Sequence, residues 1–158
     1  MAIIKPNNNT ISAITALPAA ITTGKVLQTI YAVTSSQVDL TSATWTDTGA
    51  SASITPSSTS NKILVLASVG GINRHSGDTE AQFRILRDST SIANTKGMNN
   101  NSNNFLSAPA AVMNELDTPS STSSLTYKIQ FKNRDAAGTV SVCSNSADTS
   151  ITLLEIAG

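Results

Sequence analysis

Residues 125–132 read Leu-Thr-Tyr-Lys-Ile-Gln-Phe-Lys, and this stretch decides the fold class. Its large apolar side chains, Leu125, Tyr127, Ile129 and Phe131, alternate with polar ones. A period of two places the apolar residues on one face of a β-strand and the polar residues on the other. We therefore expect a half-buried strand here, and an all-β protein wherever the same pattern recurs.

The pattern does recur on both sides of this stretch. Further strands are predicted at residues 25–33, 45–54, 62–69, 80–87, 105–116, 140–142 and 150–156. No segment shows the period of a long helix. About eight to ten short strands of this kind predict an antiparallel β-sandwich that is jelly-roll-like.

Two of these strands have special features. Residues 62–69 read Lys-Ile-Leu-Val-Leu-Ala-Ser-Val, an almost continuous apolar run that is typical of a central strand buried on both faces. We expect Gly70 and Gly71 to end it. Residues 105–116 contain Pro109, which predicts either an edge strand or two short pieces.

One hexapeptide, Thr-Pro-Ser-Ser-Thr-Ser, occurs at residues 55–60 and again at 118–123. Each copy comes directly before a strong strand. One interpretation is that proline with Ser and Thr is good turn chemistry that the chain uses twice. The other is that the copies mark equivalent corners of the two Greek-key halves of a jelly roll.

Residues 1–23 differ from the rest of the chain. They hold no acidic residue and one basic residue, Lys5, and Pro6 and Pro18 interrupt any long helix. We divide the chain into an extended N-terminal arm, residues 1–23, and a β-sandwich domain, residues 24–158. The arm is expected to dock on a partner through its large apolar residues, which are Ile3, Ile4, Ile11, Ile14, Leu17 and Ile21.

The composition excludes several classes of protein. The formal net charge is zero and only 13% of residues are charged, whereas nucleic-acid binders carry clustered Lys and Arg. Ser, Thr and Asn make up 58 of the 158 residues, while 39% are hydrophobic, which argues against a disordered tail or a coiled coil. We expect a β domain with a Ser- and Thr-rich surface and no nucleic-acid partner.

The sequence shows no pattern typical of a membrane span or of a secretory signal. No apolar run reaches the ~18 residues of a membrane span, and the first residues lack the apolar stretch of a secretory signal. The single cysteine, Cys143, excludes an intrachain disulfide and is expected to be a small buried residue in a strand. We therefore expect no membrane partner.

Catalytic chemistry is not indicated. His75 is followed by Ser76 and Asp78, but a Ser-rich chain offers such triplets by chance, so we interpret them as a polar loop. One His and one Cys cannot form the usual metal-binding clusters. The carboxylates are scattered, and no glycine-rich phosphate loop is present. We expect no enzyme activity, no cofactor and no metal.

Three features leave alternatives open. Trp45 is expected in the core, although it could stack against a sugar. Glu155 interrupts the last apolar strand and is expected to face outward, the alternative being a buried ion pair with an arginine. Residues 96–104 are expected to be an exposed loop, either a solvated tip or a recognition loop. The candidate recognition residues are Asn99, Asn100, Asn101, Asn103 and Asn104.

Several motifs together resemble a known family. They are residues 1–11 (Met-Ala-Ile-Ile-Lys-Pro-Asn-Asn-Asn-Thr-Ile), residues 53–65 around the first hexapeptide, residues 117–128 around the second, and the terminal Ile-Thr-Leu-Leu-Glu-Ile-Ala-Gly. The chain resembles small virion structural proteins of tailed phages, especially phages that infect marine cyanobacteria and related bacteria. The resemblance supplies no functional residues.

The resemblance implies a capsid decoration, or cement, protein on the head surface of a virion, assembled in the host cytoplasm. Its partners would be the major capsid protein or other virion subunits, reached through the arm. It would be a homo-oligomer, with a trimer favoured. The alternative is a tail-fibre or receptor-binding module that recognises a host surface glycan through its loops.

Overall fold

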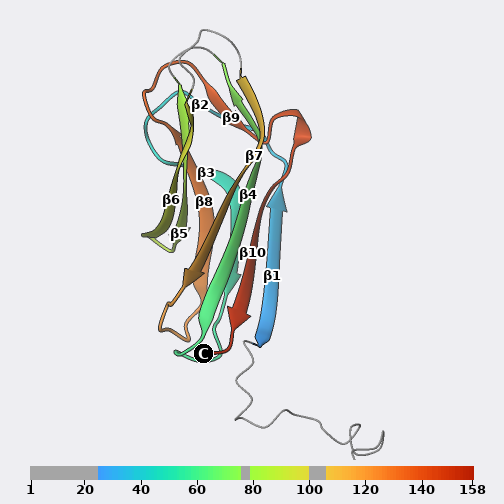
Figure 1. Cartoon of the computed structure of the whole chain (residues 1–158), viewed down its shortest axis with the longest axis vertical. Coiled ribbons are helices and arrows are strands. Elements are labelled where there is room, and N and C mark those ends of the chain that lie inside the picture. The colour runs from blue at the N-terminus through green and yellow to red at the C-terminus, as the bar shows by residue number, and fades with distance from the viewer. Residues whose placement is uncertain (1–24, 76–78, 100–105) are drawn as a thin grey trace, which may run out of the picture.

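The computed structural model describes residues 25–75, 79–99 and 106–158, without the side chains of 96–99 and 106–109. Figure 1 shows two layers of long strands. The elements are β1 (Val26–Thr34), β2 (Val38–Leu40), β3 (Thr46–Ile54), β4 (Lys62–Arg74), β5 (Glu80–Arg87), β6 (Thr90–Asn99), β7 (Leu106–Asp117), β8 (Leu125–Asn133), β9 (Val140–Val142), the 3-10 turn η1 (Ser144–Ser146) and β10 (Thr149–Ile156).

The strands form two antiparallel sheets. In sheet A the order is β1-β10-β4, with β7 on the other side of β4 and with β9 and β2 extending one end. In sheet B the order is β3-β8-β5-β6. Two sheets of four principal strands in this order form a jelly roll, with β2 and β9 as additions. The predicted antiparallel β-sandwich is confirmed.

The core lies between the two sheets. Sheet B contributes Tyr127, Ile129 and Phe131, which are fully buried, and sheet A contributes residues such as Val65 and Leu153. The alternation in β8 therefore has the predicted sense, with Lys128 and Lys132 outside. This apolar layer holds the sheets together, because burial of large aliphatic and aromatic side chains is the main favourable contribution to folding.

Strand β4 does not end at the two glycines but continues to Arg74. Gly71 has a φ of 59°, and a Cβ there would lie 2.5 Å from the backbone of Ser144. A Cβ at Gly70 would lie 2.3 Å from the carbonyl oxygen of Asp148. The glycines therefore let β4 pass close beneath the connection from β9 to β10, and the prediction that they end the strand is wrong.

Among the described residues, strand β4 is buried on one face and partly exposed on the other. Ile63, Val65 and Ala67 point into the core, whereas Leu66 is 38% exposed and Leu64 is partly exposed. Strand β7 is one strand at the sheet edge, which is where its proline is tolerated. The sequence patterns missed β2 and β6, and β6 includes residues 96–99 of the predicted loop.

The two hexapeptides occupy equivalent corners. Residues 55–60 connect β3 in sheet B to β4 in sheet A, and residues 118–123 connect β7 in sheet A to β8 in sheet B. Ile54 pairs with Leu125, so both corners lie at the same end of the sandwich. This arrangement favours the second interpretation of the repeat.

We call this end of the sandwich the base end and the opposite end the tip end. The backbone N–H of Ala157 donates to the carbonyl oxygen of Lys25 at 2.9 Å, so the chain enters and leaves the domain at the base end (Figure 1). At the tip end Arg74 pairs with Leu106 and Val140. Residues 1–24 thus join at the base end, and residues 76–78 and 100–105 join at the tip end.

Candidate docking surface

The outward face of sheet A gathers the exposed large apolar side chains of the described residues. Each is between about one third and two thirds exposed, with Tyr31 at 62% and Val112 at 66%. They are Val26, Leu27, Tyr31 and Val33 on β1, Leu66 on β4, and Val112 and Leu116 on β7. Sheet B contributes no member to this set.

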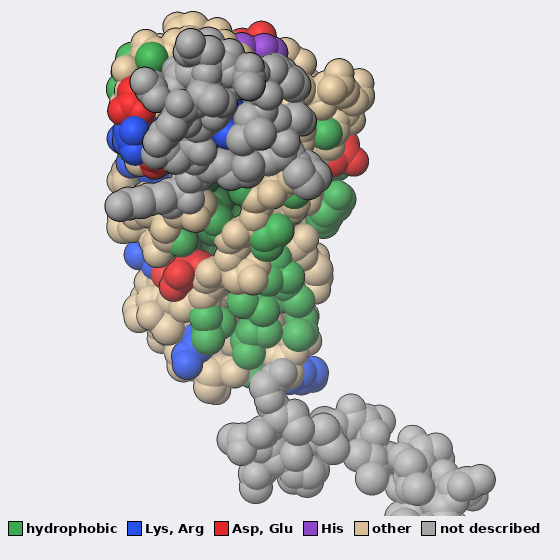
Figure 2. Space-filling model, turned by 45° about the horizontal axis from the view of Figure 1, so that its top comes forward, with side chains coloured by type: hydrophobic (Ala, Val, Ile, Leu, Met, Phe, Trp, Pro, Cys, Tyr) green, Lys and Arg blue, Asp and Glu red, His purple; other side chains and the backbone are tan. Residues whose placement is uncertain are grey.

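Strand pairing brings these side chains into adjacent rows across the sheet. One row is Thr29-Leu154-Leu64-Leu116, the next is Tyr31-Thr152-Leu66-Asn114, and the third is Val33-Ser150-Ser68-Val112. None of these twelve residues is charged. Figure 2 shows hydrophobic side chains gathered over one face of the molecule, with polar side chains between some of them. We call these three rows, with Val26 and Leu27, the apolar face.

The apolar face is large enough to matter energetically. Isolated exposed apolar residues are ordinary, but a contiguous patch on a monomer marks an interaction surface. Complete burial of one Val or Leu contributes about 1.5–3 kcal/mol, so covering the exposed part of the seven side chains contributes about 1 kcal/mol each, or roughly 7 kcal/mol in all. A partner that covers this face therefore gains binding energy without any ion pair.

The outward face of sheet B has the opposite character. Lys128 lies 3.0 Å from the carboxylate of Asp47, which also accepts a hydrogen bond from Gln130. Partial burial opposes ionisation, but the hydrogen bonds from Gln130 and Lys128 prevail and lower the pKa of Asp47. Arg84 donates to Gln130 at 2.9 Å and extends the network across the sheet.

Trp45 belongs to this polar face and not to the core, so the expected core position is wrong. The guanidinium of Arg84 lies over its ring, 4.4 Å from the centroid, and the ammonium of Lys132 lies 5.0 Å from the centroid. Cation–π attraction and the aliphatic stems of the two side chains hold the ring in place. These cations already cover part of the ring, so the alternative of sugar stacking is restricted to the part they leave uncovered.

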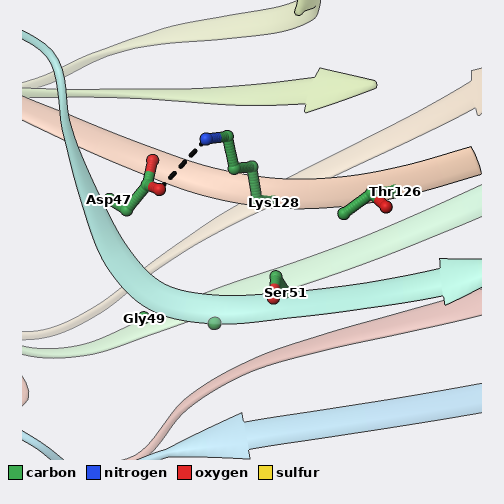
Figure 3. A pocket seen from close by; sticks show the side chains of 6 residues that line it. Asp47, Gly49, Ser51, Thr126 and Lys128 are labelled. Atoms are coloured by element: carbon green, nitrogen blue, oxygen red, sulfur yellow. Dashed lines mark hydrogen bonds and ion pairs between the residues drawn. The ribbon is translucent and has the colours of Figure 1, made fainter. Parts of the chain in front are cut away.

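A shallow hollow of about 220 Å³ opens on the same face. It forms because β3 bulges between Asp47 and Ser51, where the pairing with β8 shifts register. Figure 3 shows the bend at Gly49, whose φ is 93°. Its lining is Asp47, Gly49, Ala50, Ser51, Thr126 and Lys128. Asp47 is half exposed, so the hollow offers solvated hydrogen-bonding groups of the kind that contact hydroxyl-bearing ligands.

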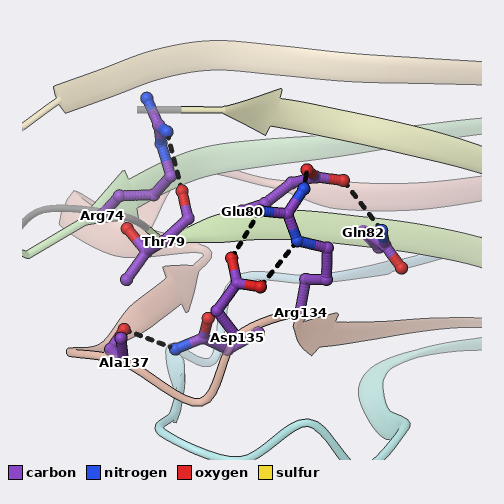
Figure 4. A network of polar contacts seen from close by, with 8 residues as sticks. Arg74, Thr79, Glu80, Gln82, Arg134, Asp135 and Ala137 are labelled. Carbon is purple, nitrogen blue, oxygen red and sulfur yellow. Dashed lines mark hydrogen bonds and ion pairs between the residues drawn. The ribbon is translucent and has the colours of Figure 1, made fainter. Parts of the chain in front are cut away.

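A second polar network braces the tip end (Figure 4). Arg134 contacts Glu80 and donates to Asp135 at 2.7 Å, and its backbone N–H donates to the carbonyl oxygen of Glu80. Arg74 is 1% exposed and donates to the carbonyl oxygen of Thr79 at 3.0 Å. Burial lowers the pKa of Arg74. These contacts hold the strand ends from which the tip segments leave.

The histidine neighbourhood offers no assembled catalytic group in the described part of the chain. The His75 ring nitrogen lies 3.3 Å from the hydroxyl of Ser141. Ser76 and Asp78 lie outside the described residues. Cys143 is buried, but it directly follows β9 in a left-handed conformation, with its sulfur 3.1 Å from the hydroxyl of Thr149. The expectation that it lies within a strand is therefore wrong by one residue.

Glu155 faces inward, contrary to the expectation. It is 1% exposed and accepts hydrogen bonds from the backbone and hydroxyl of Ser57, from Asn61 and from Gln28, at 2.5–2.8 Å. Burial alone would raise its pKa, but these donors outweigh burial and lower the pKa to about 2. The carboxylate therefore ties β1, β10 and the first hexapeptide corner together at the base end, without an arginine.

A triad of buried Tyr127 and Asp117 with partly buried Arg87 joins the two sheets at the second corner. Tyr127 donates to Asp117 at 2.7 Å, and Arg87 donates to both oxygens of the same carboxylate at 2.7 and 2.8 Å. Burial, followed by the neighbouring Asp117, raises the pKa of Tyr127 well above its usual range. The hydrogen bond to Asp117 raises the pKa of Arg87. The triad is satisfied internally, so its role is structural.

The predicted site residues fall mostly outside the described structure. The arm residues Ile3, Ile4, Ile11, Ile14, Leu17 and Ile21 lie there, as do Asn100, Asn101, Asn103 and Asn104. Asn99 ends β6 and pairs with Glu80 at the tip end. The apolar face was missed as a site, although its signal was the apolar character of residues 25–33 and 62–69 on both strand faces.

The described residues hold neither a metal-binding cluster nor a membrane-spanning helix. No group of three or more His, Cys, Asp or Glu side chains is placed to hold a metal ion among residues 25–75, 79–99 and 106–158. In the same part of the chain, no helix has the length and apolar character needed to cross a membrane.

Comparisons with known proteins show structural similarity at low sequence identity. No protein-family model and no curated protein matches the chain. Among solved structures, it is similar to the insecticidal delta-endotoxin Cry8Ea1 of Bacillus thuringiensis, with a TM-score of 0.41 and 14% identity over 77% of this chain and 20% of that chain. It is also similar to the infectious bursal disease virus VP2 subviral particle, with a TM-score of 0.37 and 11% identity over 83% of this chain and 40% of that chain. This chain thus spans less than half the length of either neighbour.

Proposed function

We propose that this chain is a virion structural protein, a capsid decoration protein that docks on the major capsid protein or on other shell subunits through residues 1–23. The observation that carries the proposal is that the arm and the tip segments join the domain at opposite ends. The arm joins the sandwich at the base end, beside the chain terminus, while residues 76–78 and 100–105 join it at the tip end. An anchored base end would leave the tip end projecting from the shell.

The energetics of the domain support an arm that serves a partner. The described strands pair with one another, and the core is filled by side chains from both sheets. The arm adds six large apolar residues and one charge to a domain that has its own core. Because apolar burial is not screened by salt, docking through the arm should depend only weakly on ionic strength.

Deletion of residues 1–23 tests this function. Purified capsids that lack the protein are mixed with the full chain or with the truncated chain and then sedimented. We expect the truncated protein to lose capsid binding and to keep the thermal unfolding midpoint of the full chain. Capsids still coated by the truncated protein would contradict the proposal.

Two matched variants sharpen this test. In the full-length chain, Ile3, Ile4, Ile11, Ile14, Leu17 and Ile21 are replaced by serine, which keeps the length of the arm and removes its apolar side chains. In the control, residues 100–104 are replaced by a Gly-Ser segment of equal length. Binding should be lost in the first variant and kept in the second, at both low and high salt.

The second candidate function is a tail-fibre or receptor-binding module for a host glycan. The observation that favours it is the polar outward face of sheet B, where Trp45 lies beside cationic side chains and the hollow presents Ser51 and Thr126. A glycan array tests it, with residues 100–104 replaced in one variant and Lys128 replaced by alanine in another. Binding that both variants abolish, together with a labelled protein located on the tail by cryo-electron microscopy, would select this function over capsid decoration.

A further inference from the structure

We propose that the apolar face is a self-association surface, through which two copies of this chain pair about a twofold axis. The first reason is the sequence of β4. An almost continuous apolar run is the pattern of a strand that is covered on both sides. In the described chain Ile63 and Val65 are covered by sheet B, but Leu64 and Leu66 on the other side have no second layer. A second copy would supply that layer.

The second reason is the width of the face. Tyr31 lies on β1 and Val112 lies on β7, the two outer strands of the four that form the face, and both are about two thirds exposed. The large apolar side chains of the face therefore reach from one outer strand to the other, with uncharged Ser, Thr and Asn side chains between them. Such a surface is matched in shape and chemistry by another sheet face.

Charge decides which sheet face that is. The three rows hold no charged side chain, and exposed Lys62 lies at the base-end margin of the face, in the row of Val26. Two copies can therefore approach through the three rows without like-charge repulsion. The outward face of sheet B carries Asp47, Lys128 and Lys132, and burying them against an apolar surface would remove water without supplying partners. Within the described residues, the surface that fits the apolar face is therefore the same face of another copy.

This matching favours a pair over a trimer. A ring of three through this face would require it to meet a different patch on the next copy, whereas a twofold contact uses the same patch twice. The twofold contact also covers the apolar face of both copies, while the cost of bringing two bodies together is incurred once.

The mass of the full-length chain in solution tests the proposal. Sedimentation velocity and light scattering are measured from sub-micromolar concentrations to on the order of 100 µM. This range resolves dissociation constants in the micromolar region. We expect a species of twice the 16.3 kDa chain mass that dissociates on dilution. A chain that stays monomeric throughout, or a stable trimer, would overturn the twofold interface.

Variants locate the contact. Leu66→Lys and Val112→Lys place a charge on the apolar face at exposed positions, so the fold should be kept and the dissociation constant should rise by at least about 100-fold. Ser53→Lys places the same charge on an exposed position of sheet B and should leave the dimer intact. A dimer that survives both face variants would refute the proposal.

A further variant separates this interface from the arm. If residues 1–23 of the same chain cover the apolar face, the full chain is monomeric and its truncation is dimeric, and this result would also refute the proposal. The Leu66→Lys variant should still bind capsids through its arm. A wild-type chain that binds capsids but does not pair would contradict this inference alone. A wild-type chain that pairs but does not bind capsids would contradict the proposed function alone.

Discussion

Replacement of Glu155 by glutamine tests the account of the base end most directly. The carboxylate is 1% exposed, and both of its oxygens accept hydrogen bonds, three on Oε1 and one on Oε2. Glutamine keeps the shape but replaces one accepting oxygen with an NH2 group, which then faces a donor. The substitution therefore removes a charge that the fold stabilises and leaves at least one buried donor without an acceptor.

The magnitude follows from the pKa. The fold lowers the pKa of Glu155 from 4.5 to about 2. A shift of one unit corresponds to about 1.4 kcal/mol, so the ionised carboxylate contributes about 3 kcal/mol to the free energy of unfolding. Because the folded-state pKa is depressed, this contribution is complete above the unfolded-state pKa and is lost as the pH falls from about 4.5 toward 2.

Urea unfolding of the wild type and of Glu155→Gln at pH 7, 4 and 2.5 measures this contribution. We expect the variant to be less stable by about 3 kcal/mol at pH 7, and the difference to shrink steadily as the pH falls. The control is Asp148→Asn, an exposed carboxylate whose loss should change stability by less than about 0.5 kcal/mol. A difference below about 1 kcal/mol at pH 7, or one that does not change with pH, would refute the reasoning.

Three further predictions concern the fold and the polar face. Gly71→Ala should lower the free energy of unfolding by at least about 2 kcal/mol in urea, because φ is 59° and the new Cβ meets the backbone of Ser144. Tyr127→Phe should cost about 1–3 kcal/mol in the same assay, because buried Asp117 loses a donor, and an unchanged midpoint would contradict the triad. Arg84→Ala should uncover the Trp45 ring and increase quenching of its fluorescence by acrylamide, whereas equal quenching in both proteins would argue against the contact.

The predicted strands agree closely with the observed ones where alternation is strong. The strand predicted at residues 80–87 has the bounds of β5, and the one at 125–132 differs from β8 by one residue. The misses have local causes. Strand β2 has only three residues, and β6 is rich in Ser, Asn and Thr, so neither shows an apolar period in sequence. Gly70 and Gly71 resembled a strand end because close backbone packing and chain reversal both require glycine.

The candidate site was harder to predict than the strands. In β10, Ile151 and Leu153 are buried, and Glu155 has the same parity, so a strict period of two places it inside. A lone carboxylate is nevertheless expected outside, because burial without partners is costly. Its partners Gln28 and Ser57 are distant in sequence and meet it only when β1 and the first corner pack at the base end.

The sequence by itself determined the all-β class, the positions of the longest strands and a turn at each hexapeptide, because side-chain period and turn chemistry are local properties. Only the tertiary structure decided which strands are neighbours, that Glu155 points inward and that Trp45 lies under cations. It also decided that the second apolar side of β4 is open to solvent. Strand pairing joins residues far apart in the chain, so whether an apolar strand face is covered depends on the layer opposite it, which no local pattern specifies.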